Sequence, residues 1–134
     1  MQDLAGLRVL VTRPAPQGRV LTDLINSHGG KAMFFPTIDF VLNDVSGALN
    51  QLSHQDWVIF ISPQAVAAVA QTLSQMPMNV KIAAIGAGTA KALSSAGLNV
   101  TLYPDSEWNA EGLLALPEFT AVKGKKIAII RGVG

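Results

Sequence analysis

The chain has 134 residues, of which 49% are hydrophobic and 14% charged, and its formal net charge is +1. This length suffices for the core of one ordinary domain, and so small a charge argues against a nucleic-acid partner. Cysteine is absent, which excludes disulfides, thiolate catalysis and cysteine-ligated zinc, and we expect a cytoplasmic protein.

The opening part of the chain alternates short apolar runs with a helical pattern. Residues 8–12 predict a buried strand, and residues 17–28 place apolar side chains at helical spacing before a pair of glycines. A second strand is expected over 31–41, where Pro36 indicates a sheet edge or a crossing between domains. A polar–apolar pattern then predicts a helix over 43–55.

The rest of the chain repeats this alternation of short apolar runs and helical patterns. Continuous apolar runs are typical of parallel strands that are covered on both faces. The alternation predicts an α/β fold with a doubly wound parallel sheet and right-handed crossovers. Residues 57–80 carry no charge, but polar residues and prolines interrupt them. They therefore lack the about 20 consecutive apolar residues that a membrane span needs. Strands are expected at 57–62, 81–85, 100–103 and from 125 onward, and helices at 65–73 (closed by Met76–Pro77), 89–96 (ended by Gly97) and 111–116.

Four apolar runs end at a hydroxyl, a cation or a glycine. Because the carboxyl ends of parallel strands meet at one sheet edge, where α/β proteins bind ligands, these exits are the candidate site. Helix N-terminal amides, hydroxyls and guanidinium groups favour carboxylates or phosphates without a metal, although helix capping explains each hydroxyl taken singly. The predicted rim comprises Thr12–Arg13, Ser62–Pro63–Gln64, Gly86–Ala87–Gly88–Thr89 and Arg131–Gly132.

The sequence lacks the usual catalytic and metal-binding patterns. It contains no nucleophile elbow or Walker loop, its carboxylates do not cluster, and His28 and His54 lie away from the strand exits. The turn 86–89 has the first two glycines of a dinucleotide loop, but Lys91 occupies the third position. A dinucleotide-dependent enzyme that uses this turn is one alternative function. A noncatalytic ligand-sensing α/β domain is the other.

Several longer motifs recur in the order and spacing of a known family. They are Thr-Arg-Pro-x-Pro-Gln-Gly (12–18), Asp-Trp-Val-Ile-Phe-Ile-Ser-Pro-Gln-Ala-Val (56–66), Ala-Ile-Gly-x-x-Thr-Ala-x-x-Leu (84–93), Gly97-Leu98, Tyr103-Pro104 and the segment 124–132. With these motifs nearly the whole chain resembles uroporphyrinogen-III synthase. Members usually carry Asn where Gln64 stands. A full member also continues with a strand that carries a proposed proton-donor tyrosine, so we expect this chain to represent roughly the first half.

The resemblance implies a lyase of tetrapyrrole (haem and sirohaem) biosynthesis that needs no cofactor. It closes linear hydroxymethylbilane, a polycarboxylate, to uroporphyrinogen III plus water and inverts ring D. By the same resemblance Thr89 assists departure of the hydroxyl group. The remaining rim residues would bind substrate carboxylates: Ser62, Gln64, Gly86 and Ala87 on one wall, Thr12 and Arg13 on the opposite wall, and Arg131 and Gly132 beside them.

The resemblance also implies a division into two domains. In the family the opening βαβ segment completes a domain that the C-terminal half builds, so residues 1–37 belong to one domain and 38–134 to another, incomplete one. A full member is expected to be a monomer. Because 8–13 and 126–131 are similar, the opening segment is expected to dock where the terminal βαβ unit would lie, or to swap into a second copy and form a dimer. These residues alone are expected to be inactive, since the cleft needs both walls.

Overall fold

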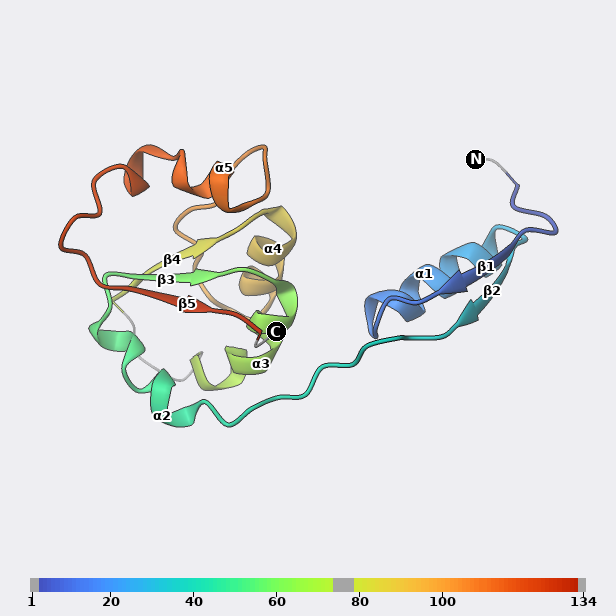
Figure 1. Ribbon diagram of the computed structural model, residues 1–134, viewed down its shortest axis with the longest axis horizontal. Coiled ribbons are helices and arrows are strands. Elements are labelled where there is room, and N and C mark those ends of the chain that lie inside the picture. The colour runs from blue at the N-terminus through green and yellow to red at the C-terminus, as the bar shows by residue number, and fades with distance from the viewer. Residues whose placement is uncertain (1–2, 74–78, 133–134) are drawn as a thin grey trace. The chain divides into compact units, whose positions relative to one another are not determined.

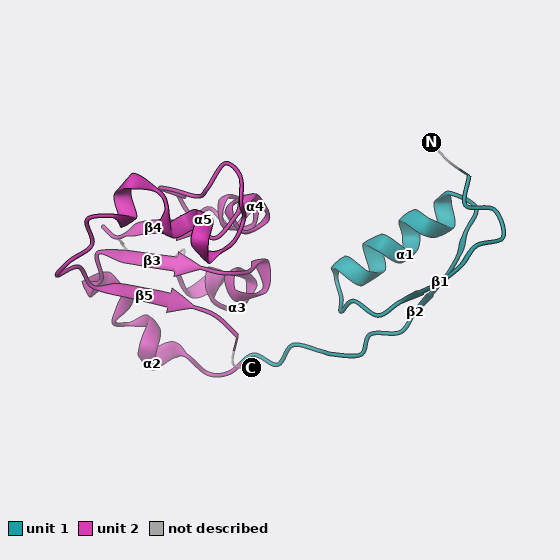
Figure 2. Ribbon diagram, turned by 45° about the horizontal axis from the view of Figure 1, so that its top comes forward, with its two compact units in different colours: residues 1–42 teal, residues 43–134 magenta. Residues whose placement is uncertain are grey.

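The computed structural model describes residues 3–73 and 79–132. The chain divides into two compact units, unit 1 (Met1–Leu42) and unit 2 (Asn43–Gly134), coloured separately in Figure 2. Each unit has its own sheet, and all the strand pairs run parallel. The predicted α/β class is therefore confirmed. Within the described residues, none of the helices has the length and apolar character that crossing a bilayer requires.

Unit 1 is a single βαβ motif. Strand β1 (Arg8–Val11) leads into helix α1 (Gln17–Ser27), and the chain returns through β2 (Lys31–Phe34). The two strands pair in parallel from Arg8 opposite Lys31 to Val11 opposite Phe34. The helix covers one face of this sheet, where Val11 and Ile25 are buried.

The other face of the unit 1 sheet is uncovered within unit 1. Leu10 and Met33 lie opposite each other in the register and are 56% and 65% exposed, and Phe35 is 58% exposed. The predicted strand over 31–41 is wrong beyond Phe34. Because β1 ends at Val11, the residues after Phe34 have no strand to pair with, although the Phe35 N–H still donates to the Val11 carbonyl at 2.9 Å. The residues after Pro36 are exposed.

Unit 2 is built around a three-stranded parallel sheet with the order β4-β3-β5 (Figure 1). In the register, Phe60 of β3 lies opposite both Ala84 of β4 and Ile130 of β5. The elements in chain order are α2 (Ser46–Leu49), η1 (Leu52–His54), β3 (Trp57–Phe60), α3 (Pro63–Leu73), β4 (Lys81–Ala84), α4 (Ala87–Ser95), α5 (Ala110–Leu114), η2 (Pro117–Phe119) and β5 (Ile127–Ile130).

The core of unit 2 lies on both faces of the central strand β3, whose four residues are all buried. Alternation along a strand sends successive side chains to opposite faces. Val58 and Phe60 therefore join the cluster formed with α3 and α4, which includes the fully buried Leu93. On the other face Trp57 packs against Phe119, with ring centroids 4.9 Å apart. This burial explains why the sequence of β3 is a continuous apolar run.

Several predicted boundaries in unit 2 are wrong. The helix expected over 43–55 is broken into α2 and η1. The strand expected over 100–103 is reduced to a single bridge between Ala83 and Leu102, although Thr101 N–H still donates to the Ile82 carbonyl at 2.8 Å. Helix α4 begins two residues earlier than expected and ends before Gly97, whose φ of +80° suits glycine. The predicted closure at Met76–Pro77 lies outside the described residues.

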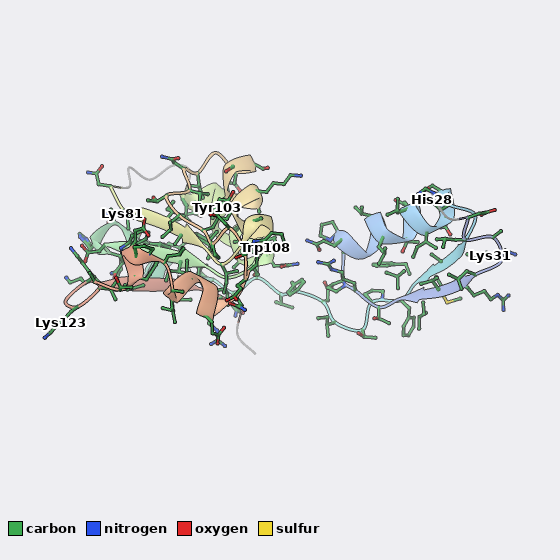
Figure 3. All side chains as sticks on the ribbon, turned by 90° about the horizontal axis from the view of Figure 1, so that it is seen from above. His28, Lys31, Lys81, Tyr103, Trp108 and Lys123 are labelled. Carbon is green, nitrogen blue, oxygen red and sulfur yellow. The ribbon has the colours of Figure 1, made fainter. Side chains whose placement is uncertain are left out.

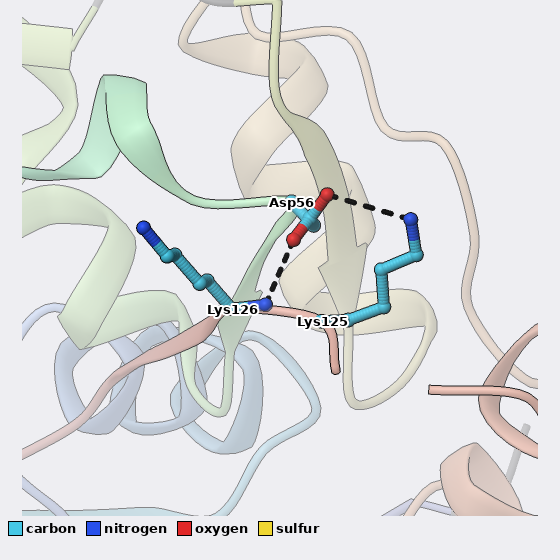
Figure 4. A network of polar contacts seen from close by, with 3 residues as sticks. All are labelled: Asp56, Lys125 and Lys126. Atoms are coloured by element: carbon cyan, nitrogen blue, oxygen red, sulfur yellow. Dashed lines mark hydrogen bonds and ion pairs between the residues drawn. The ribbon is translucent and has the colours of Figure 1, made fainter. Parts of the chain in front are cut away.

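Asp56 ties the start of β3 to the start of β5 (Figure 4). Its Oδ2 accepts a hydrogen bond from the Lys126 backbone N–H at 2.8 Å, and Lys125 Nζ lies 3.6 Å from its Oδ1. The Asp56 N–H in turn donates to the Lys126 carbonyl at 2.8 Å. The hydrogen bond from Lys126, together with the charge of Lys125, lowers the pKa of Asp56 below its ordinary value of 3.8.

This lowered pKa makes a prediction about stability and pH. Because the folded pKa lies below the unfolded one, the ionised carboxylate stabilises the fold above the unfolded value, and this contribution is lost as the pH falls through the folded value. Asp56→Asn should therefore unfold at a lower temperature than wild type at pH 7, and the gap should shrink below about pH 4. Thermal unfolding followed by circular dichroism measures this, with the exposed Asp105→Asn as control. A gap as large at about pH 2.5 as at pH 7 would contradict the prediction.

Candidate functional site

Three strand exits meet at the carboxyl edge of the unit 2 sheet. The register places Phe60, Ala84 and Ile130 side by side, so Ser62, Gly86 and Gly132 each leave the sheet two residues beyond the same row. The ladder continues one residue past the strands, since Ile85 N–H donates to the Phe60 carbonyl at 3.0 Å. Figure 1 shows α3 and α4 beginning at this same end of the sheet. The structure therefore brings together the predicted rim residues of unit 2.

Ser62 stands at the start of α3 and caps it. Its Oγ accepts a hydrogen bond from the Ala65 N–H at 3.1 Å, and Pro63 occupies the first helical position, where no N–H partner is needed. The capping role considered from the sequence is therefore correct for this residue. In this bond the hydroxyl oxygen of Ser62 is the acceptor. The half-buried Gln64 follows in the first turn of the same helix.

The start of α4 has a different character, because no side chain caps it. Gly86 is the N-cap residue and has no side chain, so the first-turn amides of Ala87, Gly88 and Thr89 receive no cap from it. Such amides carry the positive end of the helix dipole and bind carboxylates or phosphates. The backbone of Gly86 is extended, with φ −175°, which any residue adopts. What requires glycine here is space, since a Cβ would lie 2.6 Å from Trp108 Cβ.

Thr89 is the third residue of α4 and is 4% exposed. Among the described residues it is the one polar side chain in the buried class. The alternative that its hydroxyl caps the helix is wrong, because the helix begins at Ala87 with Gly86 at the N-cap. Burying a hydroxyl group costs free energy unless it makes a hydrogen bond. Thr89 therefore differs from the exposed or half-buried polar side chains of the rim.

The last rim residues of unit 2 follow β5. Arg131 and Gly132 are exposed, and the Arg131 Nε–H donates to the Gly132 carbonyl at 3.0 Å. This bond occupies one of the five N–H groups of the guanidinium. The register places Arg131 one residue past the row of Phe60, so its charge lies at the same edge as Ser62 and Gly86.

The remaining predicted rim residues, Thr12 and Arg13, belong to unit 1. Both follow β1 and are exposed, and the Thr12 carbonyl accepts a hydrogen bond from the Thr37 N–H at 3.2 Å. His28, which the sequence placed away from the strand exits, is the C-cap of α1. The described residues contain no cluster of three or more His, Asp or Glu side chains placed to hold a metal ion.

Sequence reasoning missed one residue at this edge. Trp108 lies in the segment 105–110, between the strand expected at 100–103 and the helix expected at 111–116. The structure packs the base of its side chain over Gly86 and leaves the residue 63% exposed. The available signal was a large aromatic residue inside an otherwise polar segment.

Comparisons with known proteins identify relatives of this chain. The family model described as "Uroporphyrinogen-III synthase HemD" matches residues 19–134. The uroporphyrinogen-III synthases of Escherichia coli K12 and Salmonella typhimurium LT2 are each 35% identical over 136 residues, which cover 96% of this chain and 55% of the relative. A putative uroporphyrinogen-III synthase of Methanocaldococcus jannaschii is 33% identical over 81% of this chain and 46% of its own length. The chain thus spans about half the length of the curated relatives it matches.

Proposed function

Because this chain belongs to the uroporphyrinogen-III synthase family, we propose that it supplies a carboxylate-binding wall of the active site of such an enzyme. The enzyme is a lyase of porphyrin and haem biosynthesis that acts in the cytoplasm. It converts hydroxymethylbilane to uroporphyrinogen III and water. The observation that carries this proposal is the convergence of three strand exits at one sheet edge, with Ser62, Gly86 and Gly132 leaving the same register row.

The chemistry of the substrate matches the donors at this edge. Hydroxymethylbilane is a flexible chain of four pyrroles that carries acetate and propionate groups. Its carboxylates accept hydrogen bonds from the first-turn amides of α4 (Ala87, Gly88 and Thr89), from the Ser62 hydroxyl and from the Arg131 guanidinium. Hydrogen bonds to charged acceptors are about twice as strong as neutral ones, so several of them hold a flexible polyanion in one folded shape. Gln64 and Gly132 extend the same wall.

The reaction itself needs little acid–base catalysis. The pyrrole nitrogen lone pair expels the terminal hydroxyl, which takes a proton and leaves as water, and the resulting azafulvene is attacked by ring D. A spiro intermediate then opens and recloses with ring D inverted, and a proton is lost to restore the pyrrole. We assign to Thr89 the hydrogen bond that assists the departing hydroxyl. Holding the reacting carbons close together provides most of the rate advantage.

The family architecture supplies a second part of the proposal. Residues 1–37 belong to the domain that presents Thr12 and Arg13 as the opposite wall, and 38–134 form a doubly wound domain left open on one side. The support is the uncovered face of the unit 1 sheet, where Leu10, Met33 and Phe35 are exposed. Exchange of the opening segment between two copies covers such a face.

If this exchange occurs, sedimentation analysis should show a concentration-dependent dimer. A monomer at every concentration would contradict the exchange.

Binding of the reaction product tests the proposed function directly. Anaerobic calorimetric titration of the chain with uroporphyrinogen III should give saturable binding. Ser62→Ala should weaken it about ten-fold, because a hydrogen bond to a charged group contributes about 1.5–3 kcal/mol. Ser94→Ala is the matched control, since Ser94 is exposed near the other end of α4.

The same titration separates the synthase role from the dinucleotide-enzyme alternative. The proposed synthase role predicts no saturable binding of NAD or a flavin, whereas a dinucleotide enzyme that uses the turn 86–89 predicts it. Saturable NAD binding without uroporphyrinogen binding would overturn the proposal. Circular dichroism must show that the Ser62→Ala variant is folded at the temperature of the titration, since loss of the cap alone costs about 1 kcal/mol.

A further inference from the structure

Trp108 is the most exposed aromatic residue in the described part of unit 2, ahead of Tyr103 at 42%. It is 63% exposed, whereas Trp57 is 4% exposed and lies in the core. Tryptophan is highly buried on average, because its large apolar surface is costly in water. Figure 3 shows Lys81 and Lys123 at one end of unit 2 and Trp108 at the opposite end, where the strands finish. The exposed indole therefore lies at the carboxyl edge of the sheet.

The base of the Trp108 side chain is held against the start of α4. A Cβ on Gly86 would lie 2.6 Å from Trp108 Cβ and 2.9 Å from Trp108 Cγ, so nothing larger than glycine fits beneath the indole. The contact holds the base of the side chain against Gly86, the N-cap residue of α4, whose first-turn amides no side chain caps. An apolar aromatic side chain and the start of this helix are thus neighbours.

The turn that carries Trp108 is held in one shape. Glu107, the preceding residue, has φ +50°, a conformation that costs energy in any residue other than glycine. Its carbonyl accepts a hydrogen bond from the Asn109 N–H at 2.7 Å and lies so close to Gly112 that a Cβ there would clash with it. The Asn109 Oδ1 accepts a hydrogen bond from the Gly112 N–H at 2.7 Å. These contacts hold the turn, and with it the backbone of Trp108, in one conformation.

We propose that the exposed indole of Trp108 is the apolar part of the substrate site and stacks on a pyrrole ring of the bound tetrapyrrole. This inference rests on the proposed function and deepens it. A pyrrole ring has two apolar π faces and carries carboxylates on its edge. The indole face meets the ring, while the adjacent amides of α4 bind its acetate or propionate. Offset stacking of two aromatic rings adds binding energy beyond the area buried.

Two variants of Trp108 test the stacking by calorimetry with uroporphyrinogen III under anaerobic conditions. Trp108→Ala should weaken binding about ten-fold, whereas Trp108→Phe should stay within about three-fold of wild type because it keeps an aromatic face. Leu114→Ala is the matched control. Leu114 is 60% exposed on α5 of the same unit, and its loss should leave binding unchanged.

Fluorescence gives an independent readout. Binding should quench and shift the indole emission of wild type, while Trp108→Phe, which retains the buried Trp57, should show little change. Equal binding by Trp108→Ala and wild type would overturn this inference alone. A wild-type chain without saturable binding would overturn the proposed function and the inference with it. If Trp108→Ala instead abolished a dimer and left ligand binding intact, the indole would be a protein contact and the stacking proposal would fail.

Discussion

Replacing Gly86 with alanine should weaken the binding of uroporphyrinogen III by more than ten-fold and lower the stability of unit 2 by about 1–3 kcal/mol. The added methyl group would lie 2.6 Å from Trp108 Cβ, a separation at which the neighbour has to shift. Either the segment that carries Trp108 moves away, or the first turn of α4 moves. Both changes separate the indole from the helix amides, so both remove the arrangement that we propose to recognise the substrate.

Gly47→Ala is the control for this prediction. Gly47 lies in helix α2 of the same unit, away from the proposed site, and a Cβ there would meet nothing within 4 Å. Alanine is the better helix former by up to about 1 kcal/mol, so this variant should be as stable as wild type or more stable, with unchanged binding. Calorimetry and urea unfolding of both variants measure the contrast. Equal effects of the two substitutions would show that the contact with Trp108 is not the cause of the lost binding and stability.

The 134 residues alone should not accelerate the formation of uroporphyrinogen III from hydroxymethylbilane. Productive inversion of ring D requires the folded tetrapyrrole to be held from more than one side, since positioning provides most of the rate advantage. The sheet edge that we propose as a binding wall is one side of such a site, and the chain spans about half the length of its curated relatives. Chromatography of the oxidised products distinguishes the inverted isomer III from the isomer I that closes without inversion.

This expectation separates binding from turnover. A chain that binds uroporphyrinogen III and yields only the spontaneous product supports the assignment of a single wall. The positive control is a uroporphyrinogen-III synthase such as the Escherichia coli relative, assayed on the same substrate. Isomer III formed above the spontaneous background by the 134 residues would contradict the prediction. If such activity is found, Thr89→Val should abolish it, because valine retains the shape of the threonine side chain and removes its hydroxyl.

Local patterns predicted the secondary structure well where burial is continuous. The apolar runs of β3 and β4 are strands because β3 is covered on both faces and β4 is buried after its first residue. The predictions were wrong where the partner of a segment decides its state. Residues 35–41 have strand-like composition but form no strand, because β1 ends at Val11, and residues 100–103 make a single bridge. A short apolar segment becomes a strand only when a neighbour pairs with it.

The sequence by itself determined the α/β class through its apolar periodicity, which is a local property, and it indicated the family through its longer motifs. It also showed which residues of unit 2 follow the ends of strands. Tertiary structure decided which of these residues share an edge. The alignment of Ser62, Gly86 and Gly132 depends on the register of strands far apart in the chain. The contact between Gly86 and Trp108 joins two turns separated by a helix and an extended segment. Such contacts depend on packing between distant segments, which no local pattern encodes.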